Sequence, residues 1–267
     1  KETAVSKETK NIAKEVVVEK PLLLRGEAWM DIIWDLFCPG CQIPLVGRLV
    51  AESLEELGIG DKAIMVGCVG CTGILIAGLT LDRVSPAHGR GPDVATALKR
   101  IHPDTVVFTV QGDGDCIAIG AGPLIGALTR AEKITVIMVN NTNYGTTGGQ
   151  LAPTTLTGQV TSTTPKGRSP SAEGYPVHTA EMVATFKGTA YSARGSLHTP
   201  ADYQRTKKYI KTAFQRQIEG VGFSFVEVIT ACPVNWHMTP VQALDWIGEK
   251  VVAEFPVGEF KNVARIE

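Results

Sequence analysis

The sequence predicts an α/β fold with a central, mostly parallel sheet and helices on both of its faces. Two short runs of β-branched apolar residues, TVVFTV at 105–110 and ITVIMV at 134–139, have the composition of buried parallel strands. The residues between these runs suit a helix, which makes the segment a right-handed βαβ unit. The chain has 267 residues, of which 44% are hydrophobic and 20% charged, enough to bury a large core without disulfides.

The remaining elements follow from periodicity and from residues that end helices. Apolar residues at helical spacing predict a helix from Ile43 to Leu57, ended by Gly58, and AIMVG at 63–67 predicts a buried strand. We expect Asp93 to cap a helix that ends near Arg100. Further helices are expected near 179–188 and 200–217, with a strand at 223–229. The Gly-, Thr-, Ser- and Pro-rich segment 142–178 is too long for a plain connection, and such loops are usually functional or covered by a partner.

Charge and hydropathy exclude several classes of protein. The net charge of −1 gives no basic surface for nucleic acid or for an anionic membrane. Nineteen residues from Ala63 to Leu81 carry no charge, but their four glycines disfavour a spanning helix, and we expect a strand followed by a Gly-rich loop. The first twenty residues are too polar for a signal peptide, so a cytoplasmic protein is expected.

Polar residues follow both strands of the βαβ unit. Gly112-Asp113-Gly114 comes after the first strand and Asn140-Asn141 after the second. Ligands of open parallel sheets bind at these carboxyl ends, where glycines and a helix N-terminus admit phosphate. Asp113 and Asn141 offer the oxygen ligands that Mg²⁺ prefers. GDG, 25 residues (115 to 139) and NN match the signature of the thiamine diphosphate-binding fold.

Six cysteines suggest metal or redox chemistry, since nothing indicates an oxidising compartment. Cys38 and Cys41 form a C-x-x-C pair, and Cys68 and Cys71 form a second close pair. Spacing alone leaves an iron–sulfur cluster, a zinc site and a redox dithiol open. Cys116 follows GDGD in a helix and is expected to be a small core residue.

Four motifs in order resemble one family: HGRGPDVATALKR, QGDGDCIAIG, NNTNYGTTGGQLAPTT and ACPVNW. The chain is similar, from about 37 to 256, to the β subunits of 2-oxoacid:ferredoxin oxidoreductases. The resemblance implies an N-terminal arm at 1–36, a diphosphate-binding domain at 37–256 and a C-terminal tail at 257–267. It implies Mg²⁺ ligation by the side chains of Asp113 and Asn141 and by the carbonyl of Asn143. It implies a thiamine diphosphate site made by Gly70, His88, Gly112, Gly114, Asp115, Tyr144, Gly145 and Thr146, with His88 a candidate catalytic residue.

The resemblance also implies an activity and partners. The activity would be coenzyme A-dependent oxidative decarboxylation of a 2-oxoacid, with electrons passing singly through a 4Fe–4S cluster to ferredoxin. Its cluster ligands would be Cys38, Cys41, Cys71 and Cys232, with Cys68 the competitor of Cys71. No glutamate stands in a motif that would polarise the pyrimidine ring, so that residue would come from an α subunit. Such a hetero-oligomer could also contain γ and ferredoxin-like δ subunits.

Several alternatives stay open at this point. A non-oxidative thiamine diphosphate-dependent decarboxylase or synthase subunit would share GDG and NN but would not need four cysteines. A zinc- or cluster-stabilised scaffold without catalysis is a further alternative. Gln42 departs from the small residue that the family usually has after the second cysteine. The 2-oxoacid is not specified, with 2-oxoglutarate and 3-methyl-2-oxobutanoate both candidates, and Arg168 and Arg194 are candidate partners for a second substrate carboxylate.

Overall fold

The computed structural model describes residues 36–266, which contain a sheet of seven strands. The strand order is β2-β1-β3-β4-β8-β7-β9, and every pairing is parallel except that of β9 with β7. The strands are β1 (Ala63–Gly67), β2 (Asp82–Val84), β3 (Val106–Gly112), β4 (Thr135–Asn140), β7 (Thr189–Ser196), β8 (Phe223–Ile229) and β9 (Gly258–Asn262). The predicted fold class is therefore confirmed.

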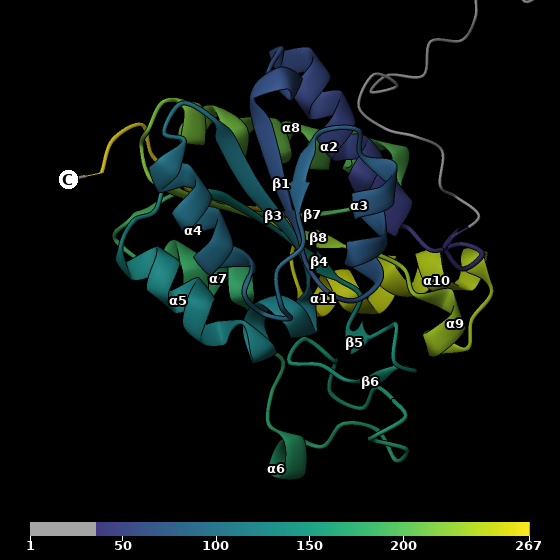
Figure 1. Ribbon diagram of the computed structural model, residues 1–267. Helices are drawn as coiled ribbons and strands as arrows, with labels where there is room; N and C mark the ends of the chain where they lie inside the picture. Colours follow the sequence, from purple (N-terminus) through teal and green to yellow (C-terminus); the bar gives the residue numbers. More distant parts are fainter. Residues whose placement is uncertain (1–35, 267) are drawn as a thin grey trace, which may run out of the picture.

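Helices cover both faces of the sheet (Figure 1). One face packs against α2 (Ile43–Leu57), α3 (Leu75–Gly78) and α8 (Pro200–Ile218). The other face packs against α4 (Gly91–Ile101), α5 (Ala121–Thr129) and α7 (Thr179–Ala184). Alternate strand residues enter the two cores, as the pleat requires: Phe108 lies in the first and Val107 in the second.

A third, smaller core lies beside the carboxyl end of β8. It is made by α9 (Pro233–Trp236), α10 (Pro240–Trp246), η7 (Ile247–Val251) and α11 (Val252–Glu254). Thr239 caps α10 by accepting from the backbone of Gln242, whose side chain bonds back to Thr239. The sheet continues past this unit, because β9 lies beyond residue 256, where we placed the start of a tail.

Most expected elements are present, and the differences have local causes. Asp93 does not cap α4; the helix begins two residues earlier, with Pro92 in its first turn. The Gly-rich segment after β1 is not only loop, since η5 (Cys71–Ile74) and α3 occupy part of it. No helix among residues 36–266 is long and apolar enough to cross a membrane. The expected arm at 1–36 lies almost wholly outside the described residues.

The sequence did not predict β7, because its residues, TAYSARGS, include a charged side chain and no apolar run. Arg194 is nonetheless fully buried in the sheet. It stands opposite Glu227 of β8, and their charged groups lie 2.9 Å apart. Arg194 also pairs with Glu181 and donates to the carbonyl of Pro256. The hypothesis that Arg194 binds a second substrate carboxylate is therefore wrong, because its guanidinium pairs with groups inside the fold.

The long segment 142–178 is organised around Arg168. It contains β5 (Asn143–Tyr144), β6 (Gln150–Leu151) and the short α6 (Pro170–Glu173). A guanidinium has five N–H donors. The Arg168 side chain donates to five backbone carbonyls, those of Pro153, Thr155, Glu173, Gly174 and Tyr175. The substrate-carboxylate hypothesis is wrong for Arg168 as well, because its donors hold the loop together.

Replacing Arg168 by lysine should loosen this segment while leaving the sheet folded. Lysine keeps the charge but offers three donors from a single point, so most of the five carbonyls lose their partner. Leaving buried carbonyls unpaired costs about 1–3 kcal/mol each. We expect limited proteolysis to cut within 150–178 at least about tenfold faster. Arg265→Lys, at an exposed position, is the control, and equal cleavage rates in the two variants would contradict this role.

The sheet topology fixes where a ligand can bind. From β1 the chain passes over the α3 face to β2, and from β3 it passes over the α5 face to β4. The connections therefore diverge between β1 and β3, and their carboxyl ends form a topological switch point. Cys68–Cys71 and Asp113–Asp115 follow these two strands directly.

Candidate functional site

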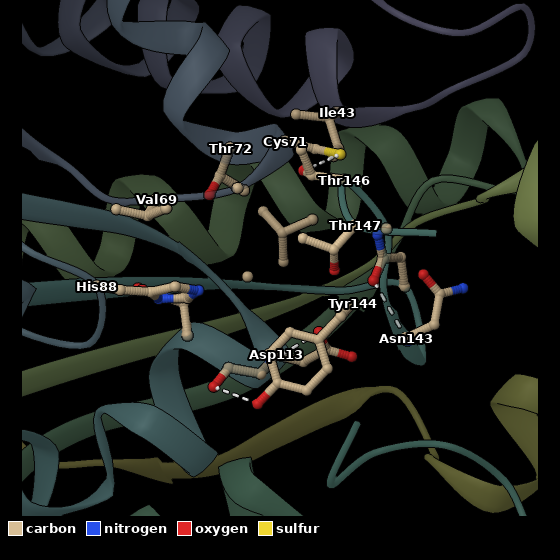
Figure 2. A pocket seen from close by; sticks show the side chains of 17 residues that line it. Ile43, Val69, Cys71, Thr72, His88, Asp113, Asn143, Tyr144, Thr146 and Thr147 are labelled. Carbon is tan, nitrogen blue, oxygen red and sulfur yellow. Dashed lines mark hydrogen bonds and ion pairs between the residues drawn. The ribbon is translucent and has the colours of Figure 1, made fainter. Parts of the chain in front are cut away.

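A pocket opens at this switch point (Figure 2). Its walls come from the segments after β1, β3 and β4, the loop before α4 and the start of α2. It is lined by Ile43, Val69, Gly70, Cys71, Thr72, His88, Gly112, Asp113, Gly114, Asp115, Val139, Asn141, Asn143, Tyr144, Gly145, Thr146 and Thr147. All the residues that the resemblance assigned to Mg²⁺ and thiamine diphosphate are among them.

Asp113 is a buried carboxylate without a cationic partner among the described residues. It accepts from the backbone N–H of Gly114 at 2.8 Å and from the hydroxyl of Thr154. Burial raises the pKa of Asp113 to about 7, and the charge of Glu227 adds to this effect, although hydrogen bonds from Thr154 and from the backbone of Gly114 and Thr142 oppose it. A buried carboxylate is costly unless a cation or hydrogen bonds compensate it, so a divalent cation fits this position.

The pocket also has room and free polar atoms for a ligand. A side chain on Gly112 would meet no protein atom within 4 Å, so it would project into open space. A Cβ on Gly114 would instead lie 2.1 Å from the Tyr144 ring, whose hydroxyl donates to the Gly114 carbonyl. The buried Oδ1 of Asn143 and Oγ1 of Thr72 have no protein partner. These features fit a polar cofactor, since buried polar atoms rarely stay unpaired.

Asp115 positions the histidine loop. Its Oδ1 bonds Nδ1 of His88 and the backbone N–H of Gly89, the latter at 2.7 Å, and its Oδ2 accepts from Gln111 at 2.6 Å. The carboxylate selects the tautomer with the proton on Nδ1, which leaves Nε2 of His88 as an acceptor. Asp115 thus lines the pocket, but both of its oxygens are engaged: Oδ1 holds His88 and Gly89, and Oδ2 accepts from Gln111.

The loop after β4 is strained and well supported. Thr142 has φ 59°, a left-handed conformation that is costly for a β-branched residue and is typical of functional sites. Its N–H donates to Asn140, its carbonyl accepts from Thr155, and its hydroxyl accepts from Gln159. A π-helix, η6 (Asp115–Ile119), follows Gly114, another departure from regular geometry that often marks functional sites.

The four cysteines assigned to a cluster lie beside one another. Burial raises the pKa of Cys41 to about 12, and the neighbouring thiols of Cys232, Cys71 and Cys38 act in the same direction. The turn Cys38–Cys41 has Gly40 in the left-handed region at φ 77°, and a Cβ there would lie 2.7 Å from Pro240. The turn is closed by a bond from the Cys41 N–H to the Cys38 carbonyl.

Within residues 36–266, no three His, Cys, Asp or Glu side chains come close enough to hold a single metal. A 4Fe–4S cluster instead binds each thiolate at its own iron. We call Cys38, Cys41, Cys71 and Cys232 the cysteine group. Because Cys71 also lines the pocket, the cysteine group and the pocket share a wall.

The remaining two cysteines point elsewhere. Cys68 is buried, and its sulfur lies where a Cβ on Gly91 would come within 2.6 Å. Burial, with the adjacent Asp115, raises the pKa of the Cys68 thiol far above its ordinary value. Cys116 is buried in the core between the sheet and α5. Of the pair Cys68 and Cys71, Cys71 is therefore the one that neighbours Cys41 and Cys232.

Gln42 ties the two ends of the cysteine group together. The side chain is buried, donates to the carbonyl of Leu197 at 2.8 Å and accepts from the N–H of Ala231 at 2.9 Å. It directly follows Cys41, and Ala231 directly precedes Cys232. The departure from a small residue thus has a structural role, because the amide joins the segments that carry two of the cysteines.

Gln42→Ala should lower the free energy of unfolding by about 2–4 kcal/mol, because it leaves a buried carbonyl and a buried N–H unpaired. It should also lower the iron content of the anaerobically purified chain. Gln42→Glu is the matched variant: it keeps the acceptor for Ala231, loses the donor to Leu197 and sets a carboxylate oxygen against that carbonyl. Iron retention and stability equal to wild type in Gln42→Ala would show that this bridge is dispensable.

Some contributors had no sequence signal of their own. Ile43, Val69, Thr72 and Thr147 line the pocket, and Thr154 supports Asp113. Thr154 stands in the stretch QLAPTT, which carried the resemblance without a role for this hydroxyl. Its bond to Asp113 joins residues 41 positions apart, which no local pattern reveals.

Comparison with known proteins identifies the family. Residues 69–228 match the family described as "Thiamine pyrophosphate enzyme, C-terminal TPP binding domain". The 2-oxoglutarate synthase subunit KorB of Methanocaldococcus jannaschii is 35% identical over 259 residues, which cover 89% of this chain and 91% of that subunit. The chain belongs to the thiamine diphosphate-binding subunits of the 2-oxoacid:ferredoxin oxidoreductases. The family predicted from the four motifs is thereby confirmed.

Other members of the 2-oxoacid:ferredoxin oxidoreductase family differ in length. The ketoisovalerate oxidoreductase subunit VorA of Methanothermobacter thermautotrophicus is 41% identical over 226 residues, covering 85% of this chain but only 47% of VorA. The chain thus spans about half of that relative. A solved 2-oxoglutarate:ferredoxin oxidoreductase from Magnetococcus marinus has the same fold, with a TM-score of 0.71, 22% identity, and coverage of 92% of this chain and 87% of that one.

Proposed function

We propose that this chain is the cofactor-binding subunit of an enzyme that oxidatively decarboxylates a 2-oxoacid, forms an acyl-coenzyme A and passes electrons singly to ferredoxin. The observation that carries this proposal is the shared wall: Cys71 lines the pocket and also neighbours Cys41 and Cys232. A non-oxidative thiamine diphosphate enzyme would not need such a group of thiols beside its cofactor.

The residues present fit the two implied groups. Asp113 and Asn141 through their side chains, and Asn143 through its carbonyl, would hold Mg²⁺ and with it the diphosphate. Cys38, Cys41, Cys71 and Cys232 would hold a 4Fe–4S cluster. Thiamine diphosphate, when bound, supplies the carbanion that cleaves the bond between the 2-oxo carbon and the carboxylate.

The chain's own side chains bind and orient the reacting groups. Thr154 and the Gly114 N–H hold the Asp113 carboxylate, and Gln159 and Thr155 hold Thr142 in its strained conformation. Asp115 holds His88 through Nδ1, which leaves Nε2 as the ring nitrogen that can exchange a proton with a bound group. The Tyr144 ring lies against Gly114 and forms that side of the pocket.

A partner subunit must complete the site. No glutamate lines the pocket in the described part of the chain, and the pyrimidine ring of the cofactor needs one. We therefore place that residue on an α subunit that carries the pyrimidine domain. Additional γ and ferredoxin-like δ subunits would complete the path to ferredoxin.

We further propose an aliphatic 2-oxoacid as substrate. Both arginines that could pair with a second carboxylate are committed to internal bonds, and no lysine or arginine lines the described pocket. Ile43 and Val69 give its upper wall an apolar character (Figure 2). Among relatives, the ketoisovalerate subunit is 41% identical and the KorB subunit cited above 35%.

The test is to co-express the chain anaerobically with its α subunit and to measure iron, acid-labile sulfide and thiamine diphosphate per αβ pair. About four irons and one cofactor would support the proposal. Cofactor without iron would support a non-oxidative enzyme instead, and iron or zinc without cofactor would support a scaffold. Ferredoxin reduction with 3-methyl-2-oxobutanoate should exceed that with 2-oxoglutarate in kcat/KM, and the reverse order would contradict the substrate assignment.

A further inference from the structure

The loop that holds the cofactor also touches the cysteine group. The hydroxyl of Thr146 lies 2.9 Å from the sulfur of Cys71, and Figure 2 shows this contact at one end of the pocket. A thiolate has no proton, so in the thiolate form of Cys71 only the Thr146 hydroxyl can be the donor. Thr146 belongs to the same short loop as Asn143 and Gly145, which line the pocket.

A second sulfur receives similar bonds. The side-chain amide of Asn235 donates to the sulfur of Cys232 at 3.4 Å and to the carbonyl of Gly145 at 2.9 Å. Bonds that favour the thiolate therefore reach both Cys71 and Cys232 from the segments packed around residues 143–146.

The same loop is anchored on its other side by the metal site. Trp236, next to Asn235, donates to the carbonyl of Asn141 at 3.2 Å, and the N–H of Asn143 bonds the Asn141 side chain at 3.4 Å. Asn143 stands three residues before Thr146 and Asn141 five residues before it, so a change in what either asparagine binds would shift the backbone that carries Thr146. The bonds to the sulfurs and the bonds to the metal site belong to one short stretch of backbone.

We infer that Thr146 is a positioning residue that tunes the reduction potential of the cluster, and that the loop 143–146 couples this potential to cofactor binding. The inference rests on the proposed function for the presence of both groups. Hydrogen bonds to cluster sulfurs are one of the determinants of potential. On reduction the cluster gains one electron and more negative charge, so a donor such as the Thr146 hydroxyl stabilises the reduced form more and raises the potential.

The coupling must act in both directions. If binding of Mg²⁺ and diphosphate fixes the loop with its donors on sulfur, the cluster becomes easier to reduce when the cofactor is bound. By linkage, the reduced protein then binds the cofactor more tightly by the same factor. The consequence is that the cluster would accept an electron more readily in the form of the enzyme that has a cofactor to oxidise.

The test uses the anaerobically purified complex with wild-type chain, Thr146→Val and Thr146→Ser. The cluster signal is identified as the electron paramagnetic resonance signal that is lost in Cys232→Ala, and its midpoint potential is titrated before and after the cofactor is removed with a chelator. Thr147→Val is the matched control, because Thr147 lines the same pocket but its hydroxyl donates to Gln150.

We expect Thr146→Val to have a lower midpoint potential than wild type, both with and without cofactor. The difference in midpoint potential between the cofactor-loaded and the cofactor-free protein should be smaller in Thr146→Val than in wild type. Thr146→Ser should restore the wild-type value, and Thr147→Val should leave it unchanged. Equal potentials for wild type and Thr146→Val would overturn the inference while the proposed function stands. Absence of iron and sulfide in the wild-type complex would instead overturn the proposed function.

Discussion

Asp113→Asn should weaken Mg²⁺-dependent binding of thiamine diphosphate by more than about 100-fold, beyond the 10–100-fold that loss of an outer-shell partner typically costs. Asparagine keeps the shape and an oxygen for the Gly114 N–H, but it removes the negative charge that a divalent cation needs. The measurement is calorimetric titration of thiamine diphosphate into the cofactor-free complex at fixed Mg²⁺. Retention of wild-type affinity and decarboxylation in this variant would rule out Asp113 as a metal ligand.

Two comparisons separate ligation from folding. Without metal, Asp113→Asn should be at least as stable as wild type near pH 7, because it removes a buried carboxylate whose pKa burial has raised to about 7. Thr154→Val should lower cofactor affinity by about 10–100-fold, since it removes one bond that orients the carboxylate. If Thr154→Val were as damaging as Asp113→Asn, orientation rather than charge would dominate this site.

The parts of the fold that the sequence predicts are those with strong local periodicity. β8 and α2 coincide with their expected ranges, because each has a pattern of apolar residues that only one period fits. β7 was not predicted, because the charge of Arg194 is neutralised across the sheet by Glu227, a residue of another strand. The short elements η5, α3 and α9 were not predicted either, because helices of about four residues are stabilised by packing rather than by local propensity.

The residues of the candidate site likewise divide into those that the sequence locates and those that it does not. Asp113 and Asn141 could be located because strand ends of a parallel sheet meet at one edge, and their spacing fits a known signature. The cysteine ligands needed the family resemblance, since spacing alone did not decide between Cys68 and Cys71. Gln42 was noticed only as a departure. Its function depends on bonds to Leu197 and Ala231, 155 and 189 residues away, which a sequence pattern does not encode.

A buried polar network in the sheet connects Arg194 of β7 with the loop after β4. Glu227, paired with Arg194, also accepts from the side chain of Asn140 at 2.7 Å. Asn140 in turn accepts from the N–H of Thr142, the strained residue of the loop after β4. The buried charges that obscured β7 in the sequence therefore support the conformation of the loop that β4 presents to the pocket. Such a network is fully paired only when every strand is in register.

Cys232→Ala should abolish the cluster while leaving thiamine diphosphate bound, and ferredoxin reduction should fall by at least about 1,000-fold. Cys232 does not line the pocket, so its loss removes no cofactor contact, whereas a cluster with three thiolates lacks a ligand for its fourth iron. Iron, sulfide and cofactor are measured on the anaerobic complex, together with electron transfer to ferredoxin. Wild-type ferredoxin reduction in this variant would show that Cys232 is not the fourth ligand.

Cys68→Ala and Cys71→Ala then decide the third ligand. Cys68 is buried against Gly91 and bonded to the Val66 carbonyl at 3.8 Å, so its replacement should keep the full iron content. Cys71→Ala should lose the cluster and, because Cys71 also lines the pocket, should alter cofactor affinity as well. The pair of variants thus distinguishes a residue shared by both sites from a core residue. An iron loss in Cys68→Ala with retention in Cys71→Ala would exchange their roles and would move the cluster away from the wall of the pocket.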